Sequence, residues 1–183
     1  MILCPRRTVA TVAVATLAVL ATQPIAAQQP PAAGAAPPCS AAEHRQFDFW
    51  TGEWDVATKD GKPAGRSRVT SILGGCALLE EWTSLVGPSR GQSFNIYDAR
   101  TRRWHQSWVD NSGLLALFDG ALRDGAMVLE GDGAGPNGGT IRTRMTFTPL
   151  ADGRVRQLWE RSADKGATWT PMFDGYYSRA EKR

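Results

Sequence analysis

The chain has 183 residues, with 21 lysines and arginines against 18 acidic residues. A chain of this length has room for one hydrophobic core and is short for two ordinary domains. No block of basic residues stands out, so the composition argues against a nucleic-acid partner.

The first 27 residues have the features of a secretory signal peptide. Arg6 and Arg7 provide a positive start, and the apolar run 9–21 follows. This run is shorter than the about 20 residues needed to span a bilayer, which argues against a membrane anchor. Small residues suit cleavage after Ala27. We therefore expect residues 1–27 to be removed and the mature chain to be periplasmic or secreted, without a membrane span.

Residues 28–38 consist of Gln, Pro, Ala and Gly. Such a segment has little apolar side chain to bury, so we expect a disordered linker. The folded domain is then expected over residues 39–183. Because the signal contains two arginines and no acids, the remaining chain carries 19 basic and 18 acidic residues and is close to neutral.

Two cysteines, Cys39 and Cys76, remain after the signal. In an oxidising compartment an even pair favours a disulfide, here between the entry segment and the start of a strand. It would close a loop of 37 residues and contribute about 3–4 kcal/mol to stability. The alternative is a pair of buried free thiols.

The segment 40–50 precedes the first predicted strand. Ser40 and Glu43 have the spacing of a helix capping box, which predicts one or two helical turns. Phe47, Phe49 and Trp50 would then form a hydrophobic plug against one end of the domain.

After Trp54 the sequence has almost no helical periodicity and shows short runs that end at Gly, Asp, Asn or Pro. Asp-Gly pairs between several runs suit tight hairpin turns. Ten such runs predict an up-and-down antiparallel meander, which removes its exposed edges by closing on itself. The predicted fold class is therefore all-β, a closed barrel of about ten strands. The strands are expected over residues 53–59, 65–73, 77–86, 92–97, 103–110, 114–122, 126–130, 140–149, 154–162 and 168–179.

Aromatic and polar side chains on these strands are candidates for lining a lumen. Seven tryptophans are many for this length, and ligand pockets combine an apolar wall with a few oriented polar groups. The alternative is that the indoles only fill the core, and alternation alone leaves open which face of each strand points inward. The candidate ligand-binding residues are Trp82, Asn95, Tyr97, Gln106, Trp108, Arg144, Gln157, Trp159 and Tyr177.

Glu80 and Glu81 are neighbours on a predicted strand and must point to opposite faces, so only one can face a lumen. An inner acid beside Arg144 or Arg156 would more often form an ion pair than a catalytic site. The other candidates for an inner acid are Asp110, Glu160 and Asp174.

Metal and cofactor chemistry have no sequence signal. The two histidines, His44 and His105, lack the spacing of a metal site, and no later histidine is present to ligate haem. The nucleophile and nucleotide motifs of known enzymes are missing as well. We expect no metal and no cofactor.

The triplet Gly52-Glu53-Trp54 resembles the Gly-x-Trp signature at the start of lipocalins and their relatives. In that superfamily the Trp packs at the closed end of the barrel beneath an Arg from the end of the last strand. The resemblance assigns these structural roles to Trp54 and Arg179. A guanidinium over an indole face is attractive by about 0.5–2 kcal/mol and would join the first strand to the last.

Longer segments resemble an uncharacterised bacterial family of secreted lipocalin-like proteins of the calycin superfamily, catalogued as a domain of unknown function. The resemblance implies a lipocalin-like barrel and supplies no activity. The resembling segments are 47–56, 74–82, 97–98, 104–110 and 156–160.

Residues 162–169 match the Asp-box, Ser-x-Asp-x-Gly-x-Thr-Trp, that occurs in sialidase propellers. In that motif the Asp caps a hairpin turn and the Trp packs beneath it, which gives Asp164 and Trp169 structural roles between the last two strands. A propeller needs several copies and this chain has one, so the motif argues against a glycosidase.

These features predict an exported barrel that binds a small apolar or amphipathic molecule in its lumen. One alternative is an enzyme that uses the lumen as its active site, with an inner acid or Tyr of perturbed pKa beside an Arg. Another is a structural or assembly protein of the cell envelope, which predicts an exposed apolar patch rather than a cavity.

Overall fold

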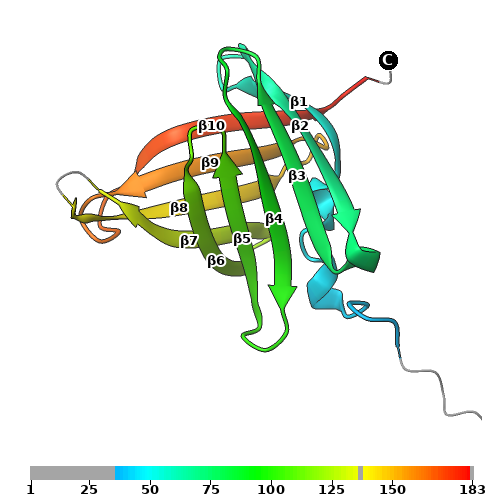
Figure 1. Ribbon diagram of the computed structural model, residues 1–183. Coiled ribbons are helices and arrows are strands. Elements are labelled where there is room, and N and C mark those ends of the chain that lie inside the picture. Colours follow the sequence, from blue (N-terminus) through cyan, green and yellow to red (C-terminus); the bar gives the residue numbers. More distant parts are fainter. Residues whose placement is uncertain (1–35, 136–137, 182–183) are drawn as a thin grey trace, which may run out of the picture. The chain divides into compact units, whose positions relative to one another are not determined.

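The computed structural model describes residues 36–135 and 138–181, which form strands and short 3-10 helices (Figure 1). The predicted signal peptide, residues 1–27, lies outside the described residues, and the predicted linker 28–38 is described only from residue 36. In the described part of the chain, no helix has the length and apolar character required to cross a bilayer.

Ten strands follow one another around a ring, each antiparallel to its two neighbours. The last strand pairs with the first, so the predicted closed antiparallel barrel of ten strands is confirmed (Figure 1). The strands are β1 (Gly52–Thr58), β2 (Pro63–Ile72), β3 (Ala77–Ser84), β4 (Arg90–Asp98), β5 (Arg103–Asp110), β6 (Leu115–Arg123), β7 (Ala126–Ala134), β8 (Thr140–Pro149), β9 (Val155–Ser162) and β10 (Thr170–Arg179).

Strand boundaries agree with the sequence pattern to within a few residues, and the largest difference is on β7. The pattern ended this strand at Glu130, but the strand continues through Gly131 and Gly133 to Ala134. At Gly131 a Cβ atom would lie 1.9 Å from the carbonyl oxygen of Leu117 on β6. The glycine there allows close approach of two strands and does not form a turn.

Side chains alternate between the interior and the exterior, and the interior set contains polar as well as apolar residues. Trp104 and Gln106 on β5 are 2% and 1% exposed, whereas His105 between them is half-buried on the outer face. On β8, Met145 and Phe147 lie inside. The buried polar side chains of the interior are Ser67, Glu80, Ser93, Asn95, Gln106 and Gln157, whereas Glu160 and Ser162 are buried on the outer face near the β9–β10 hairpin.

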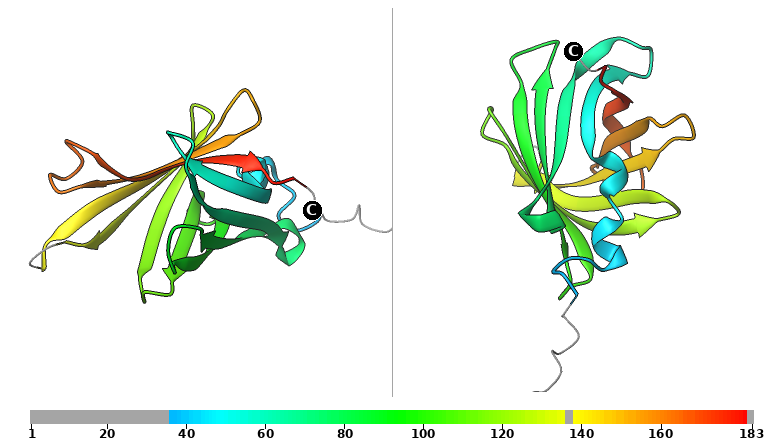
Figure 2. Two further views of the ribbon diagram at one scale, coloured as in Figure 1. Left: turned by 90° about the horizontal axis from the view of Figure 1, so that it is seen from above. Right: turned by 90° about the vertical axis from the view of Figure 1, so that its right-hand side faces the viewer.

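The segment before β1 forms the predicted plug, as two single-turn 3-10 helices, η1 (Ala42–Arg45) and η2 (Asp48–Trp50). Phe47 and Trp50 are fully buried, and the Trp50 ring lies 4.5 Å from that of Phe147 on β8. Figure 2 (right) looks onto this end of the barrel, with the two helices in front of the strands.

The predicted capping box is wrong. The residue that precedes η1 is Ala41, and no side chain caps the helix. The turn is instead closed by the backbone, where His44 N donates to Ala41 O at 3.0 Å. η1 itself has no buried residue; the plug is anchored by Phe47 and Trp50, which follow it in the chain and are fully buried.

Trp54 and Arg179 meet where the first and last strands pair. They are direct partners in the β1–β10 register, and the guanidinium carbon lies 3.9 Å from the centre of the indole ring. Arg179 Nη1 also donates to Thr51 O at 2.5 Å. The contact therefore ties three points of the closed end together.

The predicted disulfide between Cys39 and Cys76 is present, with the two Cα atoms 5.1 Å apart. Cys76 follows the short helix η3 (Leu73–Gly75) and precedes β3. The bridge attaches the start of the plug segment to the β2–β3 connection and closes a loop with a sequence separation of 37.

Candidate functional site

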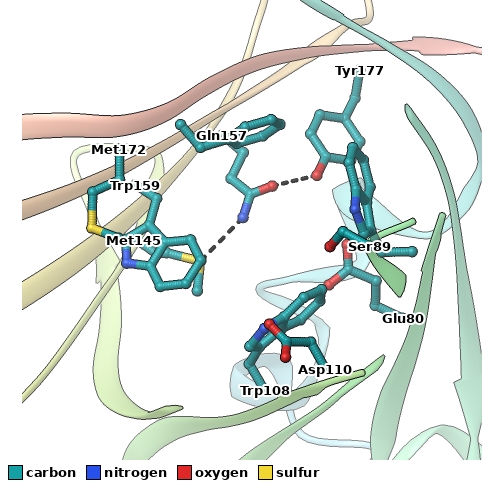
Figure 3. A pocket seen from close by; sticks show the side chains of 11 residues that line it. Glu80, Ser89, Trp108, Asp110, Met145, Gln157, Trp159, Met172 and Tyr177 are labelled. Carbon is teal, nitrogen blue, oxygen red and sulfur yellow. Dashed lines mark hydrogen bonds between the residues drawn. The ribbon is translucent and has the colours of Figure 1, made fainter. Parts of the chain in front are cut away.

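The barrel contains a cavity at the end away from the plug. Its volume is about 200 Å³, well above the roughly 10–15 Å³ that one water molecule needs on the same measure. On β5, Trp104 packs against Phe47 of the plug, whereas Trp108, further along the strand, lines the cavity. The lining residues, shown in Figure 3, are Glu80, Trp82, Ser89, Trp108, Asp110, Met145, Gln157, Trp159, Met172, Phe173 and Tyr177.

Aromatic rings from four strands form much of the cavity wall. Trp82 on β3 and Phe173 on β10 meet edge to face, with 5.7 Å between ring centroids. Trp159 on β9 makes a similar contact with Phe118 at 6.0 Å. Trp108 on β5 completes this set. The rings hold one another at defined angles and present apolar surface to a ligand.

Glycines on adjacent strands make room for two of these indoles. A Cβ atom at Gly65 would lie 2.3 Å from the Trp82 ring, and one at Gly91 would lie 2.3 Å from the Trp108 ring. Each indole therefore packs against the backbone of the strand that precedes its own, β2 for Trp82 and β4 for Trp108. A Cβ atom at either glycine would also lie 2.8 Å from a backbone carbonyl oxygen, so neither position accepts a larger residue without a shift of the backbone.

Glu80 on β3 places a buried carboxyl group in the cavity lining. It is 3% exposed, and its two oxygens accept hydrogen bonds from Ser67 Oγ and Ser93 Oγ, each at 3.0 Å. Among the described residues, no basic side chain forms an ion pair with it. Burial raises the pKa of Glu80 to about 7, while the two serine hydroxyls act to lower it.

Two buried amides support the serine that binds Glu80. Asn95 Nδ2 donates to Ser93 Oγ at 3.0 Å, and Gln106 Nε2 donates to Asn95 Oδ1 at 2.7 Å. Because Ser93 Oγ accepts from Asn95, its own proton is directed to Glu80. This chain of hydrogen bonds fixes the carboxyl group from behind.

Gln157 on β9 and Tyr177 on β10 are buried side chains that also line the cavity. The Tyr177 hydroxyl donates to Gln157 Oε1, and Gln157 Nε2 donates to Met145 Sδ at 3.1 Å (Figure 3). Burial raises the pKa of Tyr177 well above its usual value, and the charge of Glu80 adds to the shift. Tyr177 is therefore a neutral hydrogen-bond donor at physiological pH.

Asp110 supplies a second carboxyl group at the end of β5. Its Oδ1 accepts from Ser112 Oγ at 2.6 Å and from Ser112 N at 2.8 Å. These hydrogen bonds, led by that of the Ser112 side chain, hold the pKa of Asp110 below its usual range. Asp110 is half-buried and carries a negative charge at neutral pH.

The structure brings five of the nine sequence-predicted lumen residues together in this cavity, namely Trp82, Trp108, Gln157, Trp159 and Tyr177. Asn95 and Gln106 lie inside the barrel, in the network behind Glu80. Tyr97 lies at the plug end, with its ring 5.1 Å from that of His44.

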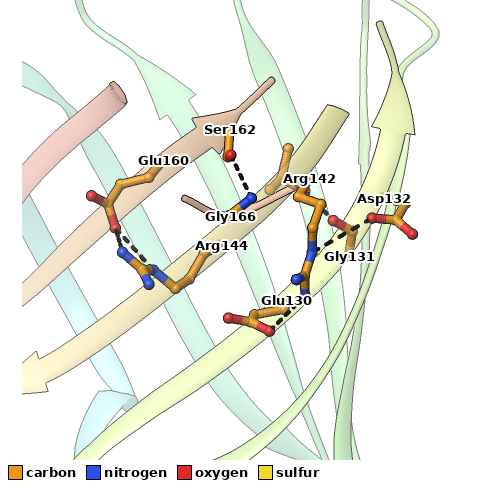
Figure 4. A network of polar contacts seen from close by, with 9 residues as sticks. Glu130, Gly131, Asp132, Arg142, Arg144, Glu160, Ser162 and Gly166 are labelled. Atoms are coloured by element: carbon orange, nitrogen blue, oxygen red, sulfur yellow. Dashed lines mark hydrogen bonds and ion pairs between the residues drawn. The ribbon is translucent and has the colours of Figure 1, made fainter. Parts of the chain in front are cut away.

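Arg144 lies on the outer face of β8 and so does not line the lumen. Its guanidinium pairs with Glu160 at 2.8 Å and lies 4.1 Å from the centre of the Trp169 ring. Figure 4 shows this pair beside the ion pair of Arg142 with Glu130. Met145 and Phe147, at odd spacings from Arg144 on the same strand, are buried inside, so strand alternation places Arg144 on the outer face, where it forms its ion pair.

The Asp-box forms the hairpin between β9 and β10. Asp164 accepts from Ser162 Oγ at 2.6 Å, from Thr168 Oγ1 at 2.6 Å and from Thr168 N at 2.9 Å. Hydrogen bonds, first that of Ser162, lower the pKa of Asp164 strongly. The motif therefore closes a turn and, through Trp169, covers the Arg144–Glu160 pair.

Several lining residues were outside the predicted set. Glu80 was one of two neighbouring acids, and only the strand register decides that it faces inward while Glu81 pairs outside with Arg68 at 2.7 Å. Met145 shares one face of β8 with the apolar residue Phe147, so strand alternation could have identified it as an inward-facing residue. Nothing in the local pattern distinguishes Ser89, in the β3–β4 loop, or Met172.

A comparison with family models gives a match over residues 40–179, to the family described as protein of unknown function (DUF1579). The chain belongs to this family. The DUF1579 match begins at the plug and ends at Arg179, so it covers the whole barrel and both partners of the Trp54–Arg179 contact. No curated protein matches the chain at a significant level.

A Ser–His–Asp triplet also occurs on the outer face of this DUF1579 domain. His105 Nδ1 lies 2.9 Å from Asp119 Oδ1, and His105 Nε2 lies 2.9 Å from Ser107 Oγ. A hydrolase also needs free N–H donors for the oxyanion. Here β5 is paired on both sides, with β4 and with β6, which uses the backbone donors. The triplet is a surface hydrogen-bond cluster.

Within residues 36–135 and 138–181, no three His, Cys, Asp or Glu side chains come together as a metal site would require. The chemistry of the cavity therefore rests on two carboxyl groups, a tyrosine, a glutamine and the aromatic wall.

Proposed function

We propose that this DUF1579 protein is an exported, lipocalin-like barrel that binds a small apolar or amphipathic molecule in its lumen. The observation that carries the proposal is the cavity of about 200 Å³ at one end of a barrel whose other end is plugged. The volume suits a small ligand, since drug-sized ligands occupy pockets of about 300–1,000 Å³.

Two further observations support the finer parts of the proposal. The Trp54–Arg179 contact at the closed end agrees with the lipocalin pattern. The Cys39–Cys76 disulfide supports an oxidising compartment, as the amino-terminal 27 residues also suggest.

The test begins with native mass spectrometry of the protein purified from its own host, which should show a small molecule bound to it. Quenching of tryptophan fluorescence by a phenol, a monoterpene alcohol and choline then measures binding. Replacing Trp159 by Leu removes wall surface; losing about 50 Å² of apolar contact should weaken binding roughly tenfold. The matched control is Trp169→Leu, on the outer hairpin.

Two results would contradict the proposal. One is a protein that carries no small molecule and shows no quenching with any member of the panel. The other is equal loss of affinity in Trp159→Leu and Trp169→Leu, because only the first indole lines the cavity.

The enzyme alternative has one observation in its favour, the raised pKa of Glu80, which suits a general acid or base at neutral pH. The arginine that it requires is missing from the cavity lining. Arg156 pairs with Asp174 at 2.7 Å on the outer face. Incubating the bound molecule with wild type and with Glu80→Gln would separate the two functions, since only a catalyst changes the covalent structure of its ligand, which NMR and mass spectrometry follow together.

The envelope-assembly alternative predicted an exposed apolar patch in place of a cavity, and the chain has both features. Phe94, Leu117 and Leu115 are 52%, 48% and 60% exposed on the outer face of β4 and β6. The cavity has a defined polar and aromatic lining, whereas nothing in the structure indicates what covers this patch. We therefore place the function in the lumen.

A further inference from the structure

The cavity lining has an unbalanced charge. It contains two carboxyl groups, Glu80 and Asp110, and no Lys, Arg or His among its eleven residues. Several basic residues lie close in sequence to lining residues. Arg144 and Arg156 are held by ion pairs outside, whereas Arg90 and Arg161 are exposed, and none of these four lines the cavity. An anionic ligand would find no positive partner there and would face two negative groups.

Glu80 is a buried carboxyl group without a positively charged partner among the described residues. Its hydrogen bonds come from two hydroxyl groups, which are neutral. Burying a carboxylate without a counter-charge costs several kcal/mol, which a proton or a cation can relieve. Because Glu80 lines the cavity, a bound ligand can supply that positive charge.

The wall around the two carboxyl groups suits an organic cation. The faces of Trp, Tyr and Phe rings attract ammonium groups, and cages of such rings bind quaternary ammonium ions. Three tryptophans, a phenylalanine and a tyrosine line this cavity. A bare metal ion would need at least three oxygen, nitrogen or sulfur side-chain ligands, and the described residues do not bring them together.

We infer that the lumen ligand is a small organic cation, an amine or a quaternary ammonium ion, whose charged group lies against Glu80 within the aromatic wall. This inference rests on the proposed lumen-binding function and adds the charge of the ligand. Asp110 adds a second negative charge to the cavity lining, and Gln157 offers a polar contact to an uncharged part of the ligand.

The inference has a pH dependence with a definite sign. The side chains that face Glu80 are Ser67 from β2 and Ser93 from β4, with Tyr177 and Asp110 as the other titratable groups of the cavity. Tyr177 stays neutral and Asp110 stays ionised from pH 5.5 to pH 8. Affinity for a cation should therefore rise with pH, by up to about tenfold per unit, until Glu80 is ionised near pH 7.

The experiment compares two probes of the same shape. Choline carries a trimethylammonium group, and 3,3-dimethylbutan-1-ol has a neutral tert-butyl group in its place. Binding to the full mature chain is measured by calorimetry and tryptophan fluorescence at pH 5.5 and pH 8. The variants are Glu80→Gln, which keeps the shape of the side chain, and Glu81→Gln, its outward-facing neighbour.

We expect choline to bind at least tenfold more tightly than the alcohol at pH 8. This preference should be reduced at pH 5.5 and in Glu80→Gln, where only the charge of Asp110 remains, and should be kept in Glu81→Gln. Equal or tighter binding of the alcohol would overturn the cation inference and leave lumen binding intact. Absence of choline binding, with quenching by neutral members of the panel, would overturn it in the same way. Failure of every probe would remove both proposals. If Glu80→Gln does not fold, Asp110→Asn replaces it as the charge variant, because Asp110 lies outside the Glu80 hydrogen-bond network. Asp110→Asn should also weaken choline binding.

Discussion

Glu80 and Glu81 show how two identical residues acquire different chemistry from the face of the strand that they occupy. Glu80 is buried against serine hydroxyls, whereas Glu81 pairs with Arg68 in solvent. Alternation predicts that the two differ. It cannot predict which one faces inward, because that depends on the register of β3 against β2 and β4.

The raised pKa of Glu80 makes stability depend on pH. Its pKa is about 7 in the folded chain against 4.5 ordinarily, so the unfolded chain ionises first as the pH rises. The free energy of unfolding should therefore fall between about pH 4.5 and pH 7, by on the order of 3 kcal/mol. Urea unfolding of Glu80→Gln should lack this decline, while Glu81→Gln should retain it. An identical pH profile for wild type and Glu80→Gln would contradict the assignment.

At the scale of elements, strands and turns were the most predictable part of the chain. Turn residues mark most of the hairpins, and Asp124 and Gly125 adopt the positive φ angles, 48° and 80°, that an Asp-Gly turn favours. The plug was predicted in place through Phe47 and Trp50, which are buried, but with the wrong cap, since no side chain caps η1. Arg144 failed as a lumen residue for a related reason, because a charged side chain in an alternating strand gives no sign of its face until the core is known.

The junction of β1 with β10 depends on Arg179. Replacing it by Ala removes the contact with Trp54 and the hydrogen bond to Thr51 O. We expect a loss of about 1–2 kcal/mol in the free energy of unfolding. Arg123→Ala, at the exposed end of β6, is the matched control and should change stability by less than about 0.5 kcal/mol. Equal stability of the two variants in urea would show that the contact contributes nothing to closure.

At the scale of the whole molecule, the closed barrel and the disulfide followed from the sequence, while the division of its interior did not. Trp104 and Trp108 lie on the same face of β5, yet one fills the plugged end and the other lines the cavity. The difference arises from contacts between segments far apart in sequence, Phe47 with Trp104 and Gly91 with Trp108. Such contacts carry no local signal, so five of the nine predicted lumen residues line the cavity and the others do not.

The central claim, that ligands bind in the tryptophan-lined end of the lumen, is tested most directly by NMR of the seven indole N–H groups. The measurement is a titration of ¹⁵N-labelled protein with the phenol, the monoterpene alcohol and choline. A bound probe should shift the signals of Trp82, Trp108 and Trp159, while those of the plug end and outer hairpin stay in place. Shifts confined to Trp50, Trp54, Trp104 or Trp169, or no shift with any probe, would contradict the claim.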